Sequence, residues 1–157
     1  MKINYHVKYI ISVLALLIFS ACGMEETESY DVKYIHIMKD EAASTSVNVK
    51  ANSVASYYVY LSSALTLDTV DVFYQVKVGD GLQQGLDFNR ITKRDTLQFL
   101  PGIFAMPVRI QWLPNQNLDW SKNNSIQIVL VGNNQGYAVG FPGSSHNQSI
   151  LTINKVK

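Results

Sequence analysis

A chain of 157 residues, of which 47% are hydrophobic and 16% charged, is long enough for one globular domain and too apolar to be disordered throughout. Its 13 Lys and Arg against 12 Asp and Glu give a charge of +1, and loss of Lys2 and Lys8 with a cleaved leader would bring it near −1. This balance argues against a nucleic-acid partner, for which a basic face is expected. A single cysteine excludes an intrachain disulfide.

The first segment has the pattern of a secretion signal. Lys2 and Lys8 precede the apolar run 10–19, and small residues follow it. This order is typical of a signal peptide, which we expect to be a helix over residues 1–21 that is removed on export. The apolar run is too short to span a bilayer, because a spanning helix takes about 20 residues.

The cysteine lies directly after this pattern. Cys22 follows Phe19-Ser20-Ala21, and the stretch resembles the bacterial lipobox, although that family prefers Leu where Phe19 stands. The resemblance implies that Cys22 is the acylated first residue of the mature protein and anchors it in a membrane, each buried methylene contributing about 0.8 kcal/mol. The alternative is an ordinary secretory signal with an incidental cysteine.

Residues 22–30 are acidic and carry no pattern of regular structure. Glu25, Glu26 and Glu28 follow the cysteine closely and resemble the surface-export signal of Bacteroidetes-type outer-membrane lipoproteins. That resemblance implies a lipid-anchored, surface-exposed protein of the bacterial outer membrane. The same residues also suit a solvated flexible tether, and the two interpretations are compatible.

From residue 31 to residue 157 the chain reads as one domain of short strands. Val70 to Val78 and Phe104 to Trp112 alternate apolar and polar residues most strictly, which is the pattern of half-buried strands. Residues 39–44 are expected to form a polar turn or a short helix. The strands are expected at 31–38, 46–49, 54–62, 70–78, 97–99, 104–112, 125–131 and 149–156. Turn signals about every 8 to 12 residues predict an all-β, antiparallel β-sandwich of seven to eight strands.

A family resemblance refines this prediction. Gly85-Leu86-Asp87-Phe88 and Leu97-Gln98-Phe99-Leu100-Pro101-Gly102 lie between the strand pieces Val72-Phe73-Tyr74 and Val108 to Ile110, in the order of a Calx-β domain. The resemblance covers roughly residues 54–156 and implies an immunoglobulin-like sandwich. Physically, the glycines supply turn conformations that other residues resist, and Asp87 can accept hydrogen bonds from nearby backbone amides.

Metal binding and catalysis are not expected. Calcium-binding members of that family carry acid clusters before the penultimate strand and after the last one, whereas here 114–119 holds a single acid and 154–157 none. His36 and His146 are the histidines that remain after the signal, and the cysteine is assigned to the lipid. We therefore predict a protein that is not an enzyme and needs no cofactor.

The first function hypothesis is glycan binding at the cell surface. Trp112 and Trp120 flank the loop 114–119, although Trp112 also suits the core at a strand end and Trp120 also suits a cap on that loop. Tyr137 and Phe141 lie beside the amides of a second loop, Asn133 to Gln135. If the fold brings these two loops to one end, aromatic faces and amides would meet and could hold a sugar. The candidate ligand-binding residues are Trp120, Asn133, Asn134 and Tyr137. Lipoproteins of this size with a sandwich domain resemble components of surface polysaccharide-uptake systems.

The second hypothesis is a structural or adhesive scaffold subunit that docks on an outer-membrane protein. Tyr57, Tyr58 and Tyr60 give one predicted strand large residues on both faces, and Tyr is enriched at protein interfaces. The alternative for this strand is a central place in the sheet with one wet face.

One modification is also predicted. Asp68-Thr69-Val70 and Asp95-Thr96-Leu97 resemble the Asp-Thr-aliphatic sequon that the same bacterial group glycosylates. Thr69 and Thr96 are therefore candidate O-glycosylation sites. Ordinary turn chemistry of Asp and Thr explains both sequences equally well.

Overall fold

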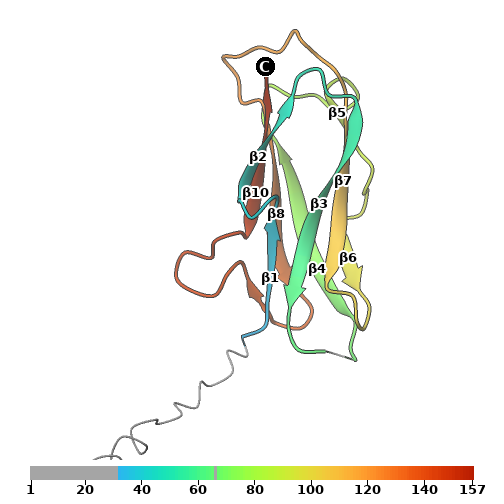
Figure 1. The fold of residues 1–157 in the computed structure, drawn as a ribbon, viewed down its shortest axis with the longest axis vertical. Helices are drawn as coiled ribbons and strands as arrows, with labels where there is room; N and C mark the ends of the chain where they lie inside the picture. The colour runs from blue at the N-terminus through green and yellow to red at the C-terminus, as the bar shows by residue number, and fades with distance from the viewer. Residues whose placement is uncertain (1–31, 66) are drawn as a thin grey trace, which may run out of the picture. The chain divides into compact units, whose positions relative to one another are not determined.

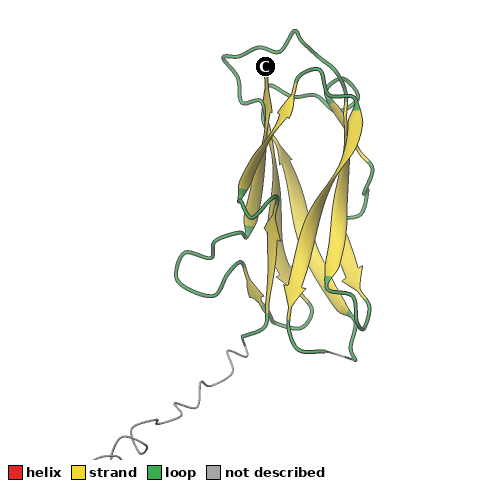
Figure 2. Cartoon of the chain, in the orientation of Figure 1, coloured by secondary structure: helices red, strands yellow, loops and turns green. Residues whose placement is uncertain are grey.

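The computed structural model describes residues 32–65 and 67–157, so the predicted signal peptide, the lipid attachment at Cys22 and the tether lie outside the described residues. Ten strands and no helix are found in the described part of the chain, and they pack as two five-stranded sheets (Figures 1 and 2). The prediction of an all-β sandwich is confirmed, with ten strands in place of the expected seven to eight.

The first sheet holds five strands in the order β5-β7-β3-β1-β9: β5 (Phe88–Arg90), β7 (Ala105–Trp112), β3 (Ser53–Ser62), β1 (Tyr34–Met38) and β9 (Ala138–Val139). The second sheet has the order β2-β10-β8-β4-β6: β2 (Ser44–Asn48), β10 (Ile150–Val156), β8 (Ser125–Asn133), β4 (Val70–Val78) and β6 (Thr96–Phe99). Most pairs are antiparallel, as predicted, but β1 pairs with β9 and β2 pairs with β10 in parallel. The segment between β1 and β2 is a turn closed by a bridge from Lys39 to Ala42 and contains no helix.

The two sheets enclose one hydrophobic core. Alternate residues of each strand point inward, because successive side chains of a strand point to opposite faces of its sheet. In β4 the buried residues are Val70, Val72 and Tyr74, and the exposed Phe73 lies between them. Trp112 at the end of β7 is a fully buried core residue, and its Nε1 donates a 2.9 Å hydrogen bond to the Tyr57 hydroxyl of β3.

The strand register defines two ends of the sandwich. Tyr34 of β1 pairs with Ser62 of β3, and Val70 of β4 pairs with Phe99 of β6, so the start of β1 and these strand ends lie together at what we call the amino end. The opposite, far end carries the end of β7 and the start of β8. The last residue of the chain lies at this far end, away from the start of β1 (Figure 1).

A buried ion pair closes the far end. The Lys155 ammonium of β10 lies 3.3 Å from Asp87 Oδ1 and donates to the carbonyls of Leu113, at 2.8 Å, and Asp87, at 3.1 Å. The Asp87 carboxylate also accepts hydrogen bonds from the Gln83 backbone amide and the Asn115 side chain, both at 2.8 Å. The expectation that Asp87 bonds a nearby backbone amide is confirmed, and the ion pair also ties two loops, 79–87 and 113–124, to the last strand.

Candidate functional site

The structure does not bring the four predicted ligand residues together. Trp120 lies in the loop that precedes β8, whereas Asn133 ends that strand and Asn134 and Tyr137 follow it. A nine-residue strand rises about 3.3 Å per residue, so it separates the two loops by roughly 26 Å. The condition for this glycan site, that the fold brings the two loops to one end, is therefore not met.

The loop around Trp120 is held by its own hydrogen bonds. Asp119 Oδ1 accepts from the backbone amide and the hydroxyl of Ser121, and these bonds hold the pKa of Asp119 below its usual value. The Trp120 ring is 43% exposed, with the Lys157 ammonium 5.0 Å from its centroid. This ring is accessible, but the predicted amides lie at the other end of the sandwich.

The predicted amides are engaged in backbone hydrogen bonds. Asn133 Oδ1 accepts from the amides of Gln135 and Tyr137, and its Nδ2 donates to the Tyr137 carbonyl at 2.8 Å. Asn134 Oδ1 accepts from the Asp71 amide at 2.9 Å. Both side chains thus hold the turn after β8, because Asx side chains readily replace backbone partners in turns. Tyr137 is half-buried, and the Lys33 ammonium lies 5.6 Å from its ring centroid.

The two predicted glycosylation residues lie at loop-to-strand junctions. Thr69 precedes β4, and its carbonyl accepts from the Gln135 side chain at 3.5 Å. Thr96 is the first residue of β6. Both residues are half-buried, and Thr96 lines the groove described next.

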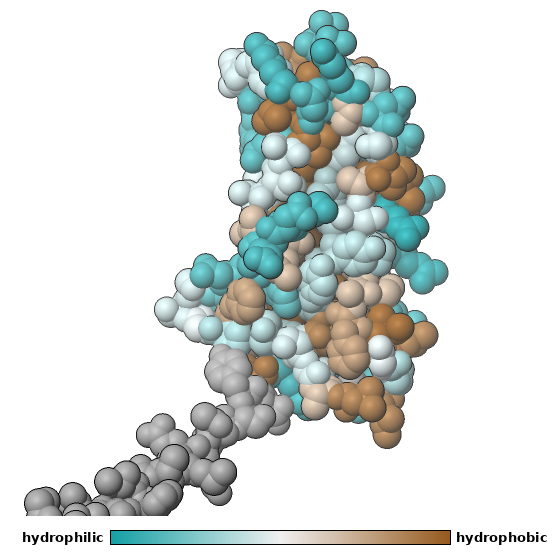
Figure 3. Space-filling view, viewed as in Figure 1, coloured by the Kyte–Doolittle hydropathy of each residue, from teal (hydrophilic) through white to brown (hydrophobic). Residues whose placement is uncertain are grey.

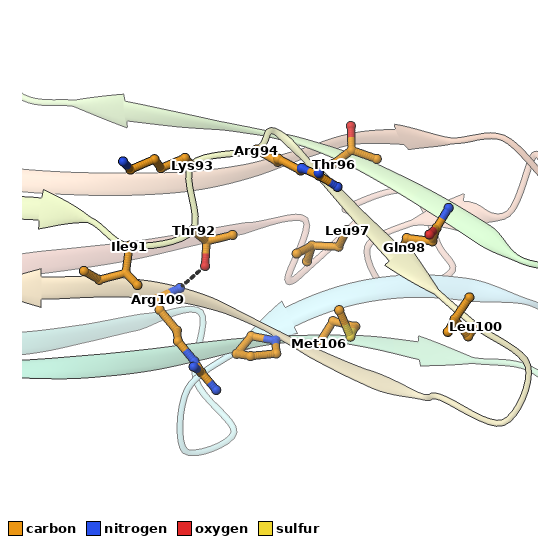
Figure 4. Close-up of a pocket in the computed structure, with 11 residues that line it drawn as sticks. Ile91, Thr92, Lys93, Arg94, Thr96, Leu97, Gln98, Leu100, Met106 and Arg109 are labelled. Atoms are coloured by element: carbon orange, nitrogen blue, oxygen red, sulfur yellow. Dashed lines mark hydrogen bonds between the residues drawn. The ribbon is translucent and has the colours of Figure 1, made fainter.

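A groove of about 660 Å³ lies between β6 and β7, on the open side of the sandwich (Figure 4). Its apolar part includes Leu97 and Met106, and its polar part includes Thr92 and Gln98. The full lining is Ile91, Thr92, Lys93, Arg94, Thr96, Leu97, Gln98, Leu100, Met106, Pro107 and Arg109. The groove therefore offers both apolar surface and hydrogen-bonding groups to a ligand.

The groove exists because both sheets end here. β6 is the edge strand of its sheet, and β5 pairs only with Ile110 to Trp112, so the first part of β7 has a free edge. The Arg109 amide points to that edge, where it donates to Thr92 Oγ1 at 2.9 Å. The backbone hydrogen-bonding groups of successive residues in a strand point to opposite edges, so those of Pro107 point to the same edge as those of Arg109. Because proline has no N–H, it leaves no unpaired donor there.

The groove is basic. Lys93, Arg94 and Arg109 line it and are exposed, and no Asp or Glu is among its lining residues in the described chain. The nearby carboxylate of Asp95 is already paired with Arg90, with 2.6 Å between Oδ1 and the guanidinium nitrogen. Lys93, Arg94 and Arg109 therefore border the groove with positive charge, and the Asp71 carboxylate beside it accepts a hydrogen bond from the side-chain amide of the lining residue Gln98 at 3.2 Å.

The loop that carries the cations is fixed at both ends. The amides of Ile91 and Thr92 donate to the Arg109 carbonyl, at 3.0 and 3.2 Å. The Tyr74 hydroxyl donates to the Arg94 carbonyl at 2.6 Å, and burial raises the pKa of this hydroxyl. The guanidinium of Arg94 is therefore attached to a backbone that is already positioned, which reduces the entropy lost on binding.

Sequence reasoning missed this groove, although the composition contained a signal for it. The chain has three arginines, Arg90, Arg94 and Arg109, and all three lie in or beside the groove. Arginine binds carboxylates and related anions through two parallel N–H groups, so such a concentration is informative.

In the part of the chain that the structure describes, no cluster of three or more His, Cys, Asp or Glu side chains could hold a metal ion. Within residues 32–65 and 67–157, no helix has the length and apolarity needed to cross a membrane. No protein-family model matches the chain, and a comparison with curated proteins finds no match.

Proposed function

We propose that the chain is a lipid-anchored binding protein of the bacterial cell envelope, and that its β6–β7 groove holds an acidic glycan. The basic groove is the observation that carries this proposal, because its lining has three cations and no carboxylate among the described residues. A role in surface polysaccharide uptake follows by analogy with lipoproteins of similar size.

The lining chemistry suits a sugar that carries carboxylate or sulfate groups. Arg94 and Arg109 can each take such a group through two N–H donors. The Thr96 hydroxyl and the Gln98 side-chain oxygen can bond sugar hydroxyls, while Met106 offers an apolar surface to the C–H face of a ring. The neutral candidates Asn133 and Asn134 are not needed for this mode of binding.

Calorimetry with an oligogalacturonide and a neutral oligoglucoside of equal length tests the proposal. We expect binding of the acidic sugar alone, weakened by added salt. Arg94→Gln or Arg109→Gln should reduce affinity at least about tenfold, since hydrogen bonds to charged groups contribute about 1.5–3 kcal/mol. The control is Lys122→Gln, which removes an exposed cation from the loop before β8. Equal affinity for both sugars, or an equal loss in the control, would contradict the proposal.

The anchor is tested separately. The native protein should partition into detergent and carry a lipid mass at Cys22, whereas Cys22→Ala should appear in the aqueous phase. A Cys22→Ala protein that stayed with the membrane would remove the lipid anchor from the proposal. Peptide mass spectrometry on the same native sample tests whether Thr69 and Thr96 carry glycans; bare residues would remove that modification.

We also propose that the sandwich is of the immunoglobulin-like Calx-β type. Support comes from Gly85 and Gly102, whose φ angles of 89° and 81° lie in the left-handed region, as the turns of the resemblance need. An experimental structure with either glycine outside that region would count against this affiliation.

The second candidate function, a scaffold subunit on an outer-membrane protein, is favoured by a row of rings on the outer face of the first sheet. Tyr58 is 41% exposed, and its ring centroid lies 6.2 Å from that of Tyr60, which stacks on His36 at 5.3 Å. Phe141 covers the other side of His36 at 5.1 Å. Exposed Tyr next to a rigid aromatic row suits a protein interface.

Cross-linked co-purification from the native membrane separates the two functions. A scaffold should bring down an outer-membrane complex, and Tyr58→Glu should release it. Phe73→Glu is the matched control, because Phe73 is also 41% exposed but lies on the other sheet. Recovery of the same complex with both variants would exclude the Tyr58 face as the docking surface.

A further inference from the structure

Two neighbouring loops at the amino end expose large apolar side chains. The loop between β3 and β4 carries Leu65, 71% exposed, and Leu67, 85% exposed. The loop between β6 and β7 carries the exposed residues Leu100, Ile103 and Phe104. We call these five residues the apolar tip; Figure 3 shows apolar surface gathered at the end of the sandwich where the two loops lie.

The strand register places the two loops side by side. Val70 pairs with Phe99, so the end of the first loop meets the start of the second. The Leu61 amide donates to the Phe104 carbonyl at 2.9 Å, so the start of the first loop meets the end of the second. The two loops therefore cross between the sheets together and form one surface.

The core does not account for these side chains. The inward positions of the flanking strands are already filled by buried residues such as Leu61, Val70 and Phe99. Five large apolar residues on two adjacent loops form a patch of the kind that marks an interaction site, whereas scattered apolar surface residues are ordinary. The runs 61–67 and 99–104, which carry the patch, contain no charged residue, and Asp68 directly follows Leu67.

The position of the chain's entry into the sandwich indicates what covers this patch. β1 starts at Tyr34, which pairs with Ser62 directly before the first loop. The segment that leads back to Cys22 thus joins the sandwich at the same end as the apolar tip. Tyr34 lies twelve positions after Cys22, and a fully extended chain spans at most about 3.6 Å per residue, so the covalent chain keeps Cys22 within roughly 43 Å of Tyr34.

We infer that the apolar tip inserts into the interface of the bilayer that holds the lipid anchor. This inference rests on the proposed acylation of Cys22. The anchor keeps the tip close to the bilayer, which makes the second contact intramolecular and effective even when the tip alone binds weakly. Insertion of loop leucines and a phenylalanine needs no anionic lipid, which agrees with the uncharged loop runs.

Depth-dependent fluorescence tests the inference on the full-length acylated protein in phosphatidylcholine vesicles. Because Cys22 is acylated, Leu67→Cys provides one free thiol for an environment-sensitive dye. We expect a blue-shifted emission that lipids with a spin-labelled acyl chain quench. The same dye at Lys122→Cys, at the far end, should keep its aqueous emission.

A second pair of variants isolates the side chains. With the dye at Ile103→Cys, the exchange of Leu65 and Leu67 for serine should remove most of the blue shift, whereas Val131→Ser, an exposed change on β8, should not. Each variant alters an exposed side chain, so circular dichroism and the thermal midpoint should match those of the parent.

The outcomes separate the possible partners of the tip. Protein that floats with the vesicles while the dye at residue 67 stays in water would overturn the inference and leave the anchor intact. Protein that does not float at all would overturn both. A blue shift that persists without vesicles and grows with protein concentration would overturn the inference and assign the tip to a second copy of the chain.

Discussion

Replacing Lys155 by methionine tests how much the buried ion pair at the far end stabilises the fold. The Lys155 side chain is 0% exposed and that of Asp87 is 2% exposed, so neither charge can turn to water. Methionine fills a similar volume but leaves the carboxylate without its cation and the Leu113 carbonyl without its 2.8 Å donor. The Gln83 amide and the Asn115 side chain still donate to Asp87 and keep it in place.

We expect a loss of about 3–5 kcal/mol in the free energy of unfolding, the usual effect of removing one partner of a buried pair. At roughly 4 °C per kcal/mol for a domain of this size, the thermal midpoint should fall by about 12–20 °C. Urea unfolding followed by fluorescence of the buried Trp112 measures the change. The double variant with Asp87→Asn should recover part of the loss, because it removes the unpaired charge.

The control is Lys157→Met, which removes an exposed lysine two residues further on and should cost less than about 0.5 kcal/mol. If Lys155→Met changed the unfolding free energy by less than about 1 kcal/mol, the pair would not stabilise the fold as argued. The same conclusion would follow if the double variant were no more stable than Lys155→Met alone.

Three further predictions concern buried groups. Tyr57→Phe should lower the free energy of unfolding by about 1–3 kcal/mol, because it leaves Trp112 Nε1 without an acceptor. Burial raises the pKa of Tyr57 to about 12, so the unfolded chain releases this proton first and the wild type should lose stability from pH 10 to 12. Urea titrations over this pH range should show that Tyr57→Phe lacks this part of the loss. Burial lowers the pKa of His36, so the unfolded chain binds more protons as the pH falls below about 6.5. In urea titrations the free energy of unfolding of the wild type should therefore decrease from pH 8 to 5. His36→Phe should lack the part of this decrease that comes from His36, whereas His146→Gln should retain it. Gly140→Ala should destabilise the loop before β10 by at least about 1–2 kcal/mol, because φ is 82° there and a Cβ would meet the His146 carbonyl; faster amide hydrogen exchange in that loop would show it.

The sequence predicted the long strands because one face of each is buried. In β4 the apolar residues recur every second position, and this local pattern is enough to place Val70–Val78. β5 and β9 span only three and two residues, and their pairing with β7 and β1 comes from the tertiary arrangement. The parallel pairs have no local signal either, because their partners lie about 100 residues apart in the chain.

The candidate site was harder to predict than the fold. Trp120 lies in the loop before β8 and Asn133 is the last residue of β8, so a single extended strand is enough to keep them apart. The three arginines in or beside the groove were visible in the sequence, but Arg109 lies near Arg90 and Arg94 only through the pairing of β5 with β7. The chemistry of these side chains can therefore be read from the sequence, but which of them lie close together depends on the register of the strands.

The path of the first two strands has a mechanical consequence. β1 lies in one sheet and β2 in the other, so the beginning of the domain is held by β3 and β9 on one side and by β10 on the other. A pull on Lys33, directed out of the amino end, acts along the axis of β1 and loads its five register pairs with β3 at once. Detachment then requires shearing these pairs together, which resists force better than peeling them one by one. A force applied to the chain before β1 would therefore be resisted by all five of these pairs together.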